Sequence, residues 1–263
     1  MQLDSLTGQP AFLYRDNSRA PKRFALVTSL HGPRFHADMV RRIADDPAAL
    51  ALTASRVAHM LGAAHYDGAV LDLAGQSRED VPRTVRVVRA IVDSAHRAGV
   101  PFIAFAIPAA DTAAYPTAPL AAVADALVVM LYDEHWPTSS PGPVATPLWV
   151  RHSLGRRVAD VGASHLIATL PIYGYLWRTN QPGQPISFDD ARHAAAQANV
   201  DLQRDPSSGS LHALRPNDWE LWMTDADVLR TLVGEVTALG VRRIGLWRLG
   251  FEDPAIWRLL PNP

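Results

Sequence analysis

The sequence predicts an α/β fold of the (β/α)8-barrel type, with parallel strands covered by helices. Two observations favour this class. Apolar strand-like segments alternate with amphipathic helical segments, and most of the strand-like segments are continuous apolar runs. Strands buried on both faces have this composition, whereas half-exposed strands alternate apolar and polar residues. The length of 263 residues, 48% of them hydrophobic, suits one barrel domain spanning residues 1–263.

Six apolar runs are predicted as parallel strands. They are Phe24–Leu30, Ala69–Gly75, Phe102–Pro108, Ala126–Asp133, Leu166–Tyr173 and Arg243–Leu249. Only 23 residues precede the first run, and Ala11–Arg15 could supply one further strand at most. We therefore expect the barrel to be incomplete or rearranged at its N-terminal side, or the chain to be cut from a longer protein.

Three predicted helices have recognisable ends. Each begins at an Asp or Ser, whose side chain can accept hydrogen bonds from the free N–H groups of the first turn, and each ends at glycine. They are Asp46–Gly62, Ser77–Gly99 and Asp225–Gly240. Helices between apolar strands predict βα units.

Two segments interrupt this alternation. Pro137–Pro147 is rich in Pro, Ser and Gly and is expected to form a long loop. Residues 182–224 contain a short predicted helix at Phe188–Asn199, a hairpin around Ser207–Ser210 and an apolar strand at Trp219–Met223. We expect this second segment to be a small α+β insertion after the seventh strand of the barrel.

Composition excludes several function classes. The net charge of −1 offers no basic field for a nucleic-acid backbone. The absence of cysteine excludes disulfides, thiolate metal sites and a cysteine nucleophile. No apolar run is long enough to span a membrane, and no signal peptide is visible. Nucleotide-binding, serine-hydrolase and zinc-protease motifs are also missing, so we expect no cofactor.

Four motifs overlap predicted strands or their C-terminal ends. Asp67–Ala74 reads Asp-Gly-Ala-Val-Leu-Asp-Leu-Ala, and Val128–His135 contains Met-Leu-Tyr-Asp. Pro171–Trp177 reads Pro-Ile-Tyr-Gly-Tyr-Leu-Trp, and Ile244–Gly250 contains Trp247. In this order the motifs resemble those of glycoside hydrolase family 18, the chitinase-like family, and of its spore cortex hydrolase-like bacterial branch.

The resemblance implies a site without its general acid. The family's strand reads D-G-x-D-x-D-x-E, and Asp72 matches the middle acid, which would hold the 2-acetamido group of the substrate in a substrate-assisted mechanism. Val70 replaces the first acid, and Ala74 replaces the general-acid Glu. General acid catalysis is worth roughly 10²–10⁴-fold in rate, so the resemblance implies a catalytically impaired relative. The alternative for Asp72 is a structural carboxylate.

The resemblance also implies contacts with the sugar. Tyr132 and Asp133 would reach the acetamido carbonyl and the sugar, although a strand-end Tyr can also make a core hydrogen bond. The remaining predicted substrate-binding residues are Tyr173, Tyr175, Trp177, Trp247 and Glu134. Flat aromatic faces suit the C–H face of a pyranose ring, and core packing is their alternative role. Trp219 and Trp222 could equally wall the groove or pack the insertion, while His31 and His36 are expected to be loop residues.

Three functions stay open from the sequence. We favour binding of polysaccharide containing N-acetylglucosamine, such as chitin or peptidoglycan, outside the cytoplasm of a bacterium. The first alternative is an active glycosidase whose acid comes from Asp133 or Glu134; strand alternation would place Asp133 and His135 on one face and Glu134 on the other. Asp133 and His135 have no marked third ligand, so a metal is not expected. The second alternative is an interaction module that no longer binds sugar.

Overall fold

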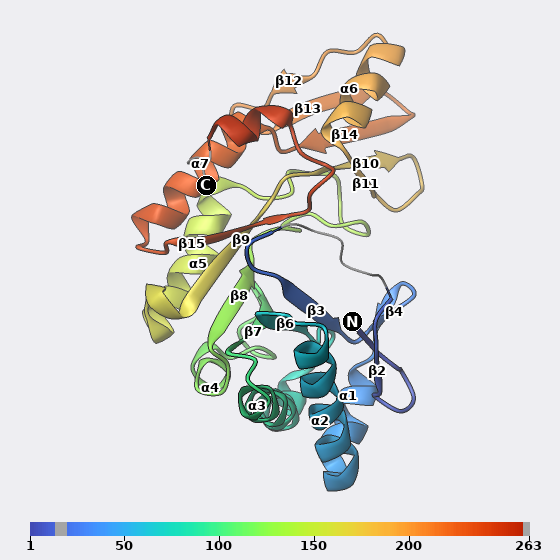
Figure 1. Ribbon diagram of the computed structural model, residues 1–263. Helices are drawn as coiled ribbons and strands as arrows, with labels where there is room; N and C mark the ends of the chain where they lie inside the picture. Colours follow the sequence, from blue (N-terminus) through green and yellow to red (C-terminus); the bar gives the residue numbers. More distant parts are fainter. Residues whose placement is uncertain (14–19, 260–263) are drawn as a thin grey trace. The chain divides into compact units, whose positions relative to one another are not determined.

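The computed structural model describes residues 1–13 and 20–259 (Figure 1). The chain divides into two compact units, one of residues 1–129 with 160–166 and the other of residues 130–159 with 167–263. The predicted strand at Ala11–Arg15 falls partly outside the described residues, and its first residue belongs to the short strand β2 (Pro10–Ala11). The single-domain organisation with an insertion at residues 182–224 stays a prediction.

The first unit contains a mainly parallel sheet with the strand order β8-β7-β6-β3-β1-β2. Its strands are β1 (Gln2–Leu3), β3 (Phe24–Thr28), β6 (Gly68–Asp72), β7 (Phe102–Pro108) and β8 (Ala126–Met130), besides β2. Strands β1, β3, β6 and β7 pair in parallel, and β2 is antiparallel to β1. The register sets Thr28 opposite Asp72. The four predicted strands of this unit are therefore present.

Three of these strands are shorter than the apolar runs that predicted them. The first ends at Thr28 because Leu30 pairs with Phe35 in the hairpin of β4 (Leu30–His31) and β5 (Arg34–Phe35). The second ends at Asp72 and the fourth at Met130. Apolar residues of the following connections continue each run, so composition alone overestimates strand length.

Helices α1 (Ala37–Asp45), α2 (Pro47–Ala63), α3 (Val81–Arg97) and α4 (Thr117–Ala121) complete this unit. Asp46 caps α2 by accepting from the backbone N–H groups of Ala48 and Ala49, as its position predicts. A capping box of Ser77 and Asp80 precedes α3, through the 3-10 turn η1 (Arg78–Asp80). Helices α2 and α3 pack against each other with fully buried apolar side chains such as Leu61.

The second unit contains the parallel pair β9 (Leu166–Pro171) and β15 (Arg243–Trp247), with helices α5 (Pro147–Val161) and α7 (Ala226–Ala238). Arg151 of α5 forms an ion pair with Glu235 of α7 at 2.6 Å. The 3-10 turn η3 (Pro254–Arg258) also belongs to this unit, whereas the 3-10 turn η2 (Ala163–His165), which precedes β9, belongs to the first unit. Within the described ranges, no helix combines the length and apolar character needed to cross a bilayer.

A five-stranded antiparallel sheet forms the rest of the second unit, in the order β11-β10-β14-β13-β12. Its strands are β10 (Gly174–Arg178), β11 (Gln184–Ile186), β12 (Gln203–Arg204), β13 (Leu211–Arg215) and β14 (Trp219–Met223). Helix α6 (Phe188–Gln197) lies beside this sheet in Figure 1. The predicted helix, hairpin and final strand of the insertion are thus present, and β10 and β11 extend the sheet beyond them.

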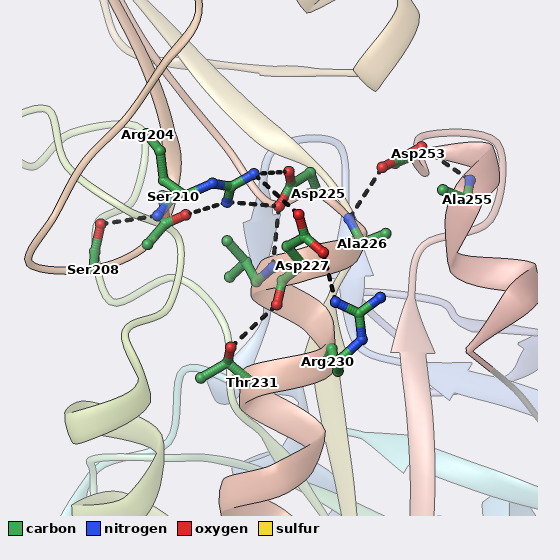
Figure 2. A network of polar contacts seen from close by, with 12 residues as sticks. Arg204, Ser208, Ser210, Asp225, Ala226, Asp227, Arg230, Thr231, Asp253 and Ala255 are labelled. Carbon is green, nitrogen blue, oxygen red and sulfur yellow. Dashed lines mark hydrogen bonds and ion pairs between the residues drawn. The ribbon is translucent and has the colours of Figure 1, made fainter.

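A polar network fastens β12 to the start of α7 (Figure 2). Arg204 donates to both carboxylate oxygens of Asp225, at 3.2 and 2.5 Å. Asp225 in turn accepts from the backbone N–H of Val228 at 3.0 Å, so the predicted N-cap of α7 is also an anchor for the sheet. Asp253 accepts from the backbone N–H of Ala226 at 3.1 Å.

Candidate functional site

The C-terminal ends of β3 and β6 bring three polar residues together. The backbone N–H of Ser29 donates to the carbonyl of Asp72 at 3.1 Å. The hydroxyl of Thr28 donates to Asp72 Oδ2 at 3.5 Å, which is at the outer limit of a hydrogen bond. Asp72 Oδ1 is buried and has no hydrogen-bond partner within the described residues. The predicted middle acid is therefore a half-buried residue whose carboxylate has one buried, unused acceptor oxygen.

Burial dominates the electrostatics of Asp72. It raises the pKa of this carboxyl to about 6, and only the hydrogen bond from Thr28 opposes the change. A low-dielectric surrounding disfavours the charged form of an acid. Two other polar atoms, Ser29 Oγ after β3 and Gln76 Oε1 in the turn after β6, are also buried without a partner among the residues described. Such orphan atoms are rare in folded proteins and indicate a place for a water or a ligand.

Ala74 lies in the turn after β6, half-buried. Its carbonyl accepts from Gln76 Nε2 at 3.4 Å, and the next residue, Gly75, has φ +82°, a conformation that side chains disfavour. The turn therefore presents a methyl group where the resemblance implies a carboxyl. That this position is the family's general-acid position stays a prediction.

In the second unit, Asp133 accepts hydrogen bonds from two tyrosines. The hydroxyls of Tyr173 and Tyr175 both donate to Asp133 Oδ1, the latter at 3.0 Å. Burial raises the pKa of Asp133, and these two bonds oppose the change because they favour the charged form. The structure thus joins three of the predicted site residues in one hydrogen-bonded group.

The predicted strand alternation through this segment is wrong. Strand β8 ends at Met130, and Asp133 has φ +60°, in the left-handed region that ends regular strand geometry. The side chains of Asp133, Glu134 and His135 therefore do not follow the pleat of a strand. His135 Nδ1 instead lies 3.0 Å from the carbonyl oxygen of Ser140, within the following loop.

Glu134 is held by the start of α5. Its carboxylate accepts from the backbone N–H of Thr146 at 2.7 Å and from the hydroxyl of Thr146 at 3.3 Å. The same hydroxyl accepts from the backbone N–H of Trp149 at 3.2 Å, which makes Thr146 the cap of this helix. These contacts favour a structural role for Glu134, which fixes the loop between β8 and α5.

The predicted sugar-stacking residues fall into two groups. Tyr173, Tyr175 and Trp177 are buried, with 4% to 5% of each side chain exposed, and pack with Val144. Trp247 is 38% exposed and stacks on Tyr132, with ring centroids 6.1 Å apart and planes 11° from parallel. Core packing, the alternative role, is therefore favoured for the first group. Trp247 keeps an accessible ring on a fixed support.

The other aromatic and histidine candidates also have local partners. Trp219 is buried in the core of the antiparallel sheet, whereas Trp222 is half-buried and packs on His212 with ring centroids 4.3 Å apart. His31 and His36 lie in and just after the β4–β5 hairpin, with ring centroids 5.9 Å apart. Thr28 and Ser29 were not singled out from the sequence, although a Thr-Ser pair ending an apolar run was a visible signal.

Comparison with known proteins identifies relatives across most of the chain. No family model matches the sequence. The chain is 26% identical over 252 residues to a Bacillus subtilis protein called a sporulation-specific glycosylase, YdhD, and the match covers 89% of this chain and 59% of YdhD. The resemblance to glycoside hydrolase family 18 is confirmed. The chain thus spans about six-tenths of the length of YdhD.

Solved structures establish the fold of this family 18 relative. A chitinase from Chromobacterium violaceum matches with a TM-score of 0.83 at 20% identity, over 98% of this chain and 87% of that one. The spore cortex-lytic enzyme SleL of Bacillus cereus matches with a TM-score of 0.79 at 19% identity, over 89% of this chain and 57% of that one. The predicted α/β class of the barrel type is therefore confirmed.

Proposed function

We propose that this family 18 relative binds polysaccharide containing N-acetylglucosamine and hydrolyses it weakly or not at all. The observation that carries the proposal is the buried Oδ1 of Asp72, which has no partner within the described residues. The amide N–H of a 2-acetamido group is a donor that would satisfy this oxygen. A site built around a required hydrogen bond rejects ligands that lack the donor, because the buried acceptor is then left unpaired.

The exposed ring of Trp247 supports the same ligand class. Its stack on Tyr132 fixes the indole in place, and a fixed flat face suits the C–H face of a pyranose. The names of the relatives, which refer to chitin and to spore cortex, support a polymer of amino sugars. They also support an action outside the cytoplasm of a bacterium.

We propose weak hydrolysis because the candidate proton donors are poorly suited to that role. The methyl group of Ala74 cannot do so, and Glu134 is bonded to Thr146. One observation favours the alternative of an active glycosidase: burial raises the pKa of Asp133, as a general acid near neutral pH requires. The two tyrosine hydroxyls act against this role, since they stabilise the charged carboxylate.

Product release from N-acetylglucosamine oligomers at high protein concentration tests the proposal, with binding measured by calorimetry in parallel. We expect binding without turnover by the native protein, loss of binding in Asp72→Ala, and turnover in Ala74→Glu. Ala122→Glu, at an exposed position after α4, controls for the added carboxylate. Native turnover that disappears in Asp133→Asn would overturn the proposal in favour of the relocated acid, and absence of binding would favour an interaction module.

A further inference from the structure

A pocket of about 530 Å³ lies in the second unit. Its walls are the segment 137–141, the connection from β10 to β11 at residues 178–182, and the β13–β14 hairpin at residues 214–220. Of the residues discussed above for the sugar site, Trp177 and Trp219 are in its lining. This volume is within the range of small-molecule sites, and neither Asp72 nor Trp247 is in its lining.

Backbone hydrogen bonds fix the walls of this pocket. The N–H of Gly183 donates to the carbonyl of Pro137 at 2.7 Å, which ties the two flanking connections together. The N–H of Thr179 donates to the carbonyl of Asp218 at 2.8 Å, which ties β10 to the hairpin turn. A pocket whose walls are held in this way loses little conformational entropy when a ligand binds.

Two arginines share one carboxylate in the pocket lining. Arg178 Nη1 lies 3.8 Å from Asp218 Oδ1, and Arg215 Nη1 lies 3.3 Å from Asp218 Oδ2. Both side chains are about half exposed, and within the described residues neither guanidinium donates a well-aligned hydrogen bond. Each guanidinium carries five N–H donors. One loosely held carboxylate therefore leaves most of these donors free to bind a ligand.

The second acid in the lining, Glu220, has other partners. Its Oε1 accepts from Trp222 Nε1 at 2.8 Å and lies 3.1 Å from His212 Nε2. The amide side chains of Asn180, Gln181 and Asn217 complete the polar lining. The pocket thus offers two guanidinium groups with free donors, surrounded by groups that can bond a peptide.

We propose that this pocket is a second ligand site, which binds a carboxylate on the peptide-bearing part of a peptidoglycan strand. The planar fork of a guanidinium matches a carboxylate with two parallel hydrogen bonds. Chitin carries no carboxylate, so the pocket favours peptidoglycan as the polymer. This inference depends on the proposed glycan binding only where it selects peptidoglycan as the polymer.

Calorimetry with matched ligands tests the site. The ligands are a disaccharide–peptide fragment of peptidoglycan, the same fragment with its carboxylates amidated, the free peptide, the disaccharide without peptide, and the N-acetylglucosamine tetramer. We expect amidation to weaken binding of the fragment by about tenfold, the equivalent of one charge-assisted hydrogen-bonded pair. Arg178→Gln with Arg215→Gln should remove this difference and leave tetramer binding unchanged. Arg89→Gln, at an exposed arginine of α3, is a control for the loss of a distant positive charge and should keep the difference.

The remaining ligands locate the carboxylate. If the free peptide binds and its binding depends on both arginines, the carboxylate lies in the peptide. If the disaccharide alone binds and its binding depends on both arginines, the carboxylate lies on the sugar. Either result supports the site. Arg215→Lys keeps the positive charge but removes the planar guanidinium. We expect it to halve the logarithm of the ratio between the affinities for the free and the amidated fragment. An amidation effect that is absent, or that survives in the folded double variant, overturns the site. Failure of the tetramer to bind would instead count against the proposed function alone.

Discussion

Asp72, which we propose as a binding residue, also affects the stability of the fold. Burial raises its pKa from 3.8 to about 6. An acid whose pKa is higher in the folded protein makes its full contribution to stability below its unfolded pKa. This contribution to stability is lost as the pH rises through the folded pKa. A change of this size corresponds to about 3 kcal/mol. At neutral pH the charged carboxylate therefore lowers the free energy of unfolding.

We predict that Asp72→Asn increases the free energy of unfolding at pH 7.5 by up to about 3 kcal/mol. The gain should shrink between pH 6 and pH 4, because the native side chain becomes neutral over that range. Urea unfolding at several pH values measures the effect, and Asp93→Asn on the outer face of α3 is a control. An equal effect of Asp72→Asn at pH 4.5 and pH 7.5 would show that the charge is not the cause.

A second prediction concerns Trp247, whose exposed ring is supported by Tyr132. Trp247→Ala should weaken binding of N-acetylglucosamine oligomers by about 1 kcal/mol, or roughly fivefold, the usual size of an aromatic stacking contact. Trp257→Ala removes another exposed Trp of the second unit, 49% exposed, and should leave binding unchanged. Calorimetric titration of both variants with the oligomers measures the effect. Equal losses of affinity in the two variants would indicate general destabilisation instead of a lost stacking contact.

At this scale the roles of the predicted site residues stay predictions, and the structure shows which of these residues contact one another. The sequence singled out Asp72, Asp133 and the two tyrosines that bond Asp133. It placed Glu134 in the sugar site, but the contact that holds Glu134 comes from Thr146, twelve residues further on. A loop contact of this kind depends on backbone conformations, such as φ +60° at Asp133, that no residue type in the segment predicts.

At the scale of elements, the contact between Arg204 and Asp225 joins the antiparallel sheet to α7 (Figure 2). The side chain of Asp225 is 9% exposed, so removal of Arg204 would leave a largely buried carboxylate with only its capping bond. We predict that Arg204→Met lowers the free energy of unfolding by about 1–2 kcal/mol.

Arg230 provides the matched control for this prediction. It pairs with Asp227 at 2.6 Å in the same network, but both side chains are more than 60% exposed. Exposed pairs contribute about 0–1 kcal/mol, so Arg230→Met should change stability by less than about 0.5 kcal/mol. Chemical denaturation of both variants measures the difference. Equal effects would indicate that Asp225 gains nothing from its partner on β12.

Element existence was predictable where local signals agreed. Helices α2, α3 and α7 begin beside the caps that the sequence shows, at Asp46, Ser77 with Asp80, and Asp225. The ends of the strands were not predictable, because apolar residues such as Leu131 and Ile172 stay buried after their strands end. Helix α5 was also missed, since the predicted loop before it hides its start at Pro147.

At the scale of the whole molecule, the balance of charge separates the two kinds of binding proposed here. The chain has a net charge of −1, so its summed field neither attracts nor repels a ligand strongly. We predict that affinity for the neutral N-acetylglucosamine tetramer changes by less than about twofold between 0.05 and 0.5 M NaCl. Its contacts are stacking and hydrogen bonds, which salt screens little.

The same titration should separate the carboxylated fragment from the tetramer. The exposed guanidinium groups of Arg178 and Arg215 lie where salt screens charges, so the advantage of the free over the amidated fragment should fall several-fold across this range. Calorimetry at four salt concentrations measures how the affinities for the tetramer and for the carboxylated fragment depend on salt, with one protein sample. A tetramer affinity that falls as steeply as that of the fragment would mean that sugar binding itself depends on exposed charge, against the roles proposed for Asp72 and Trp247.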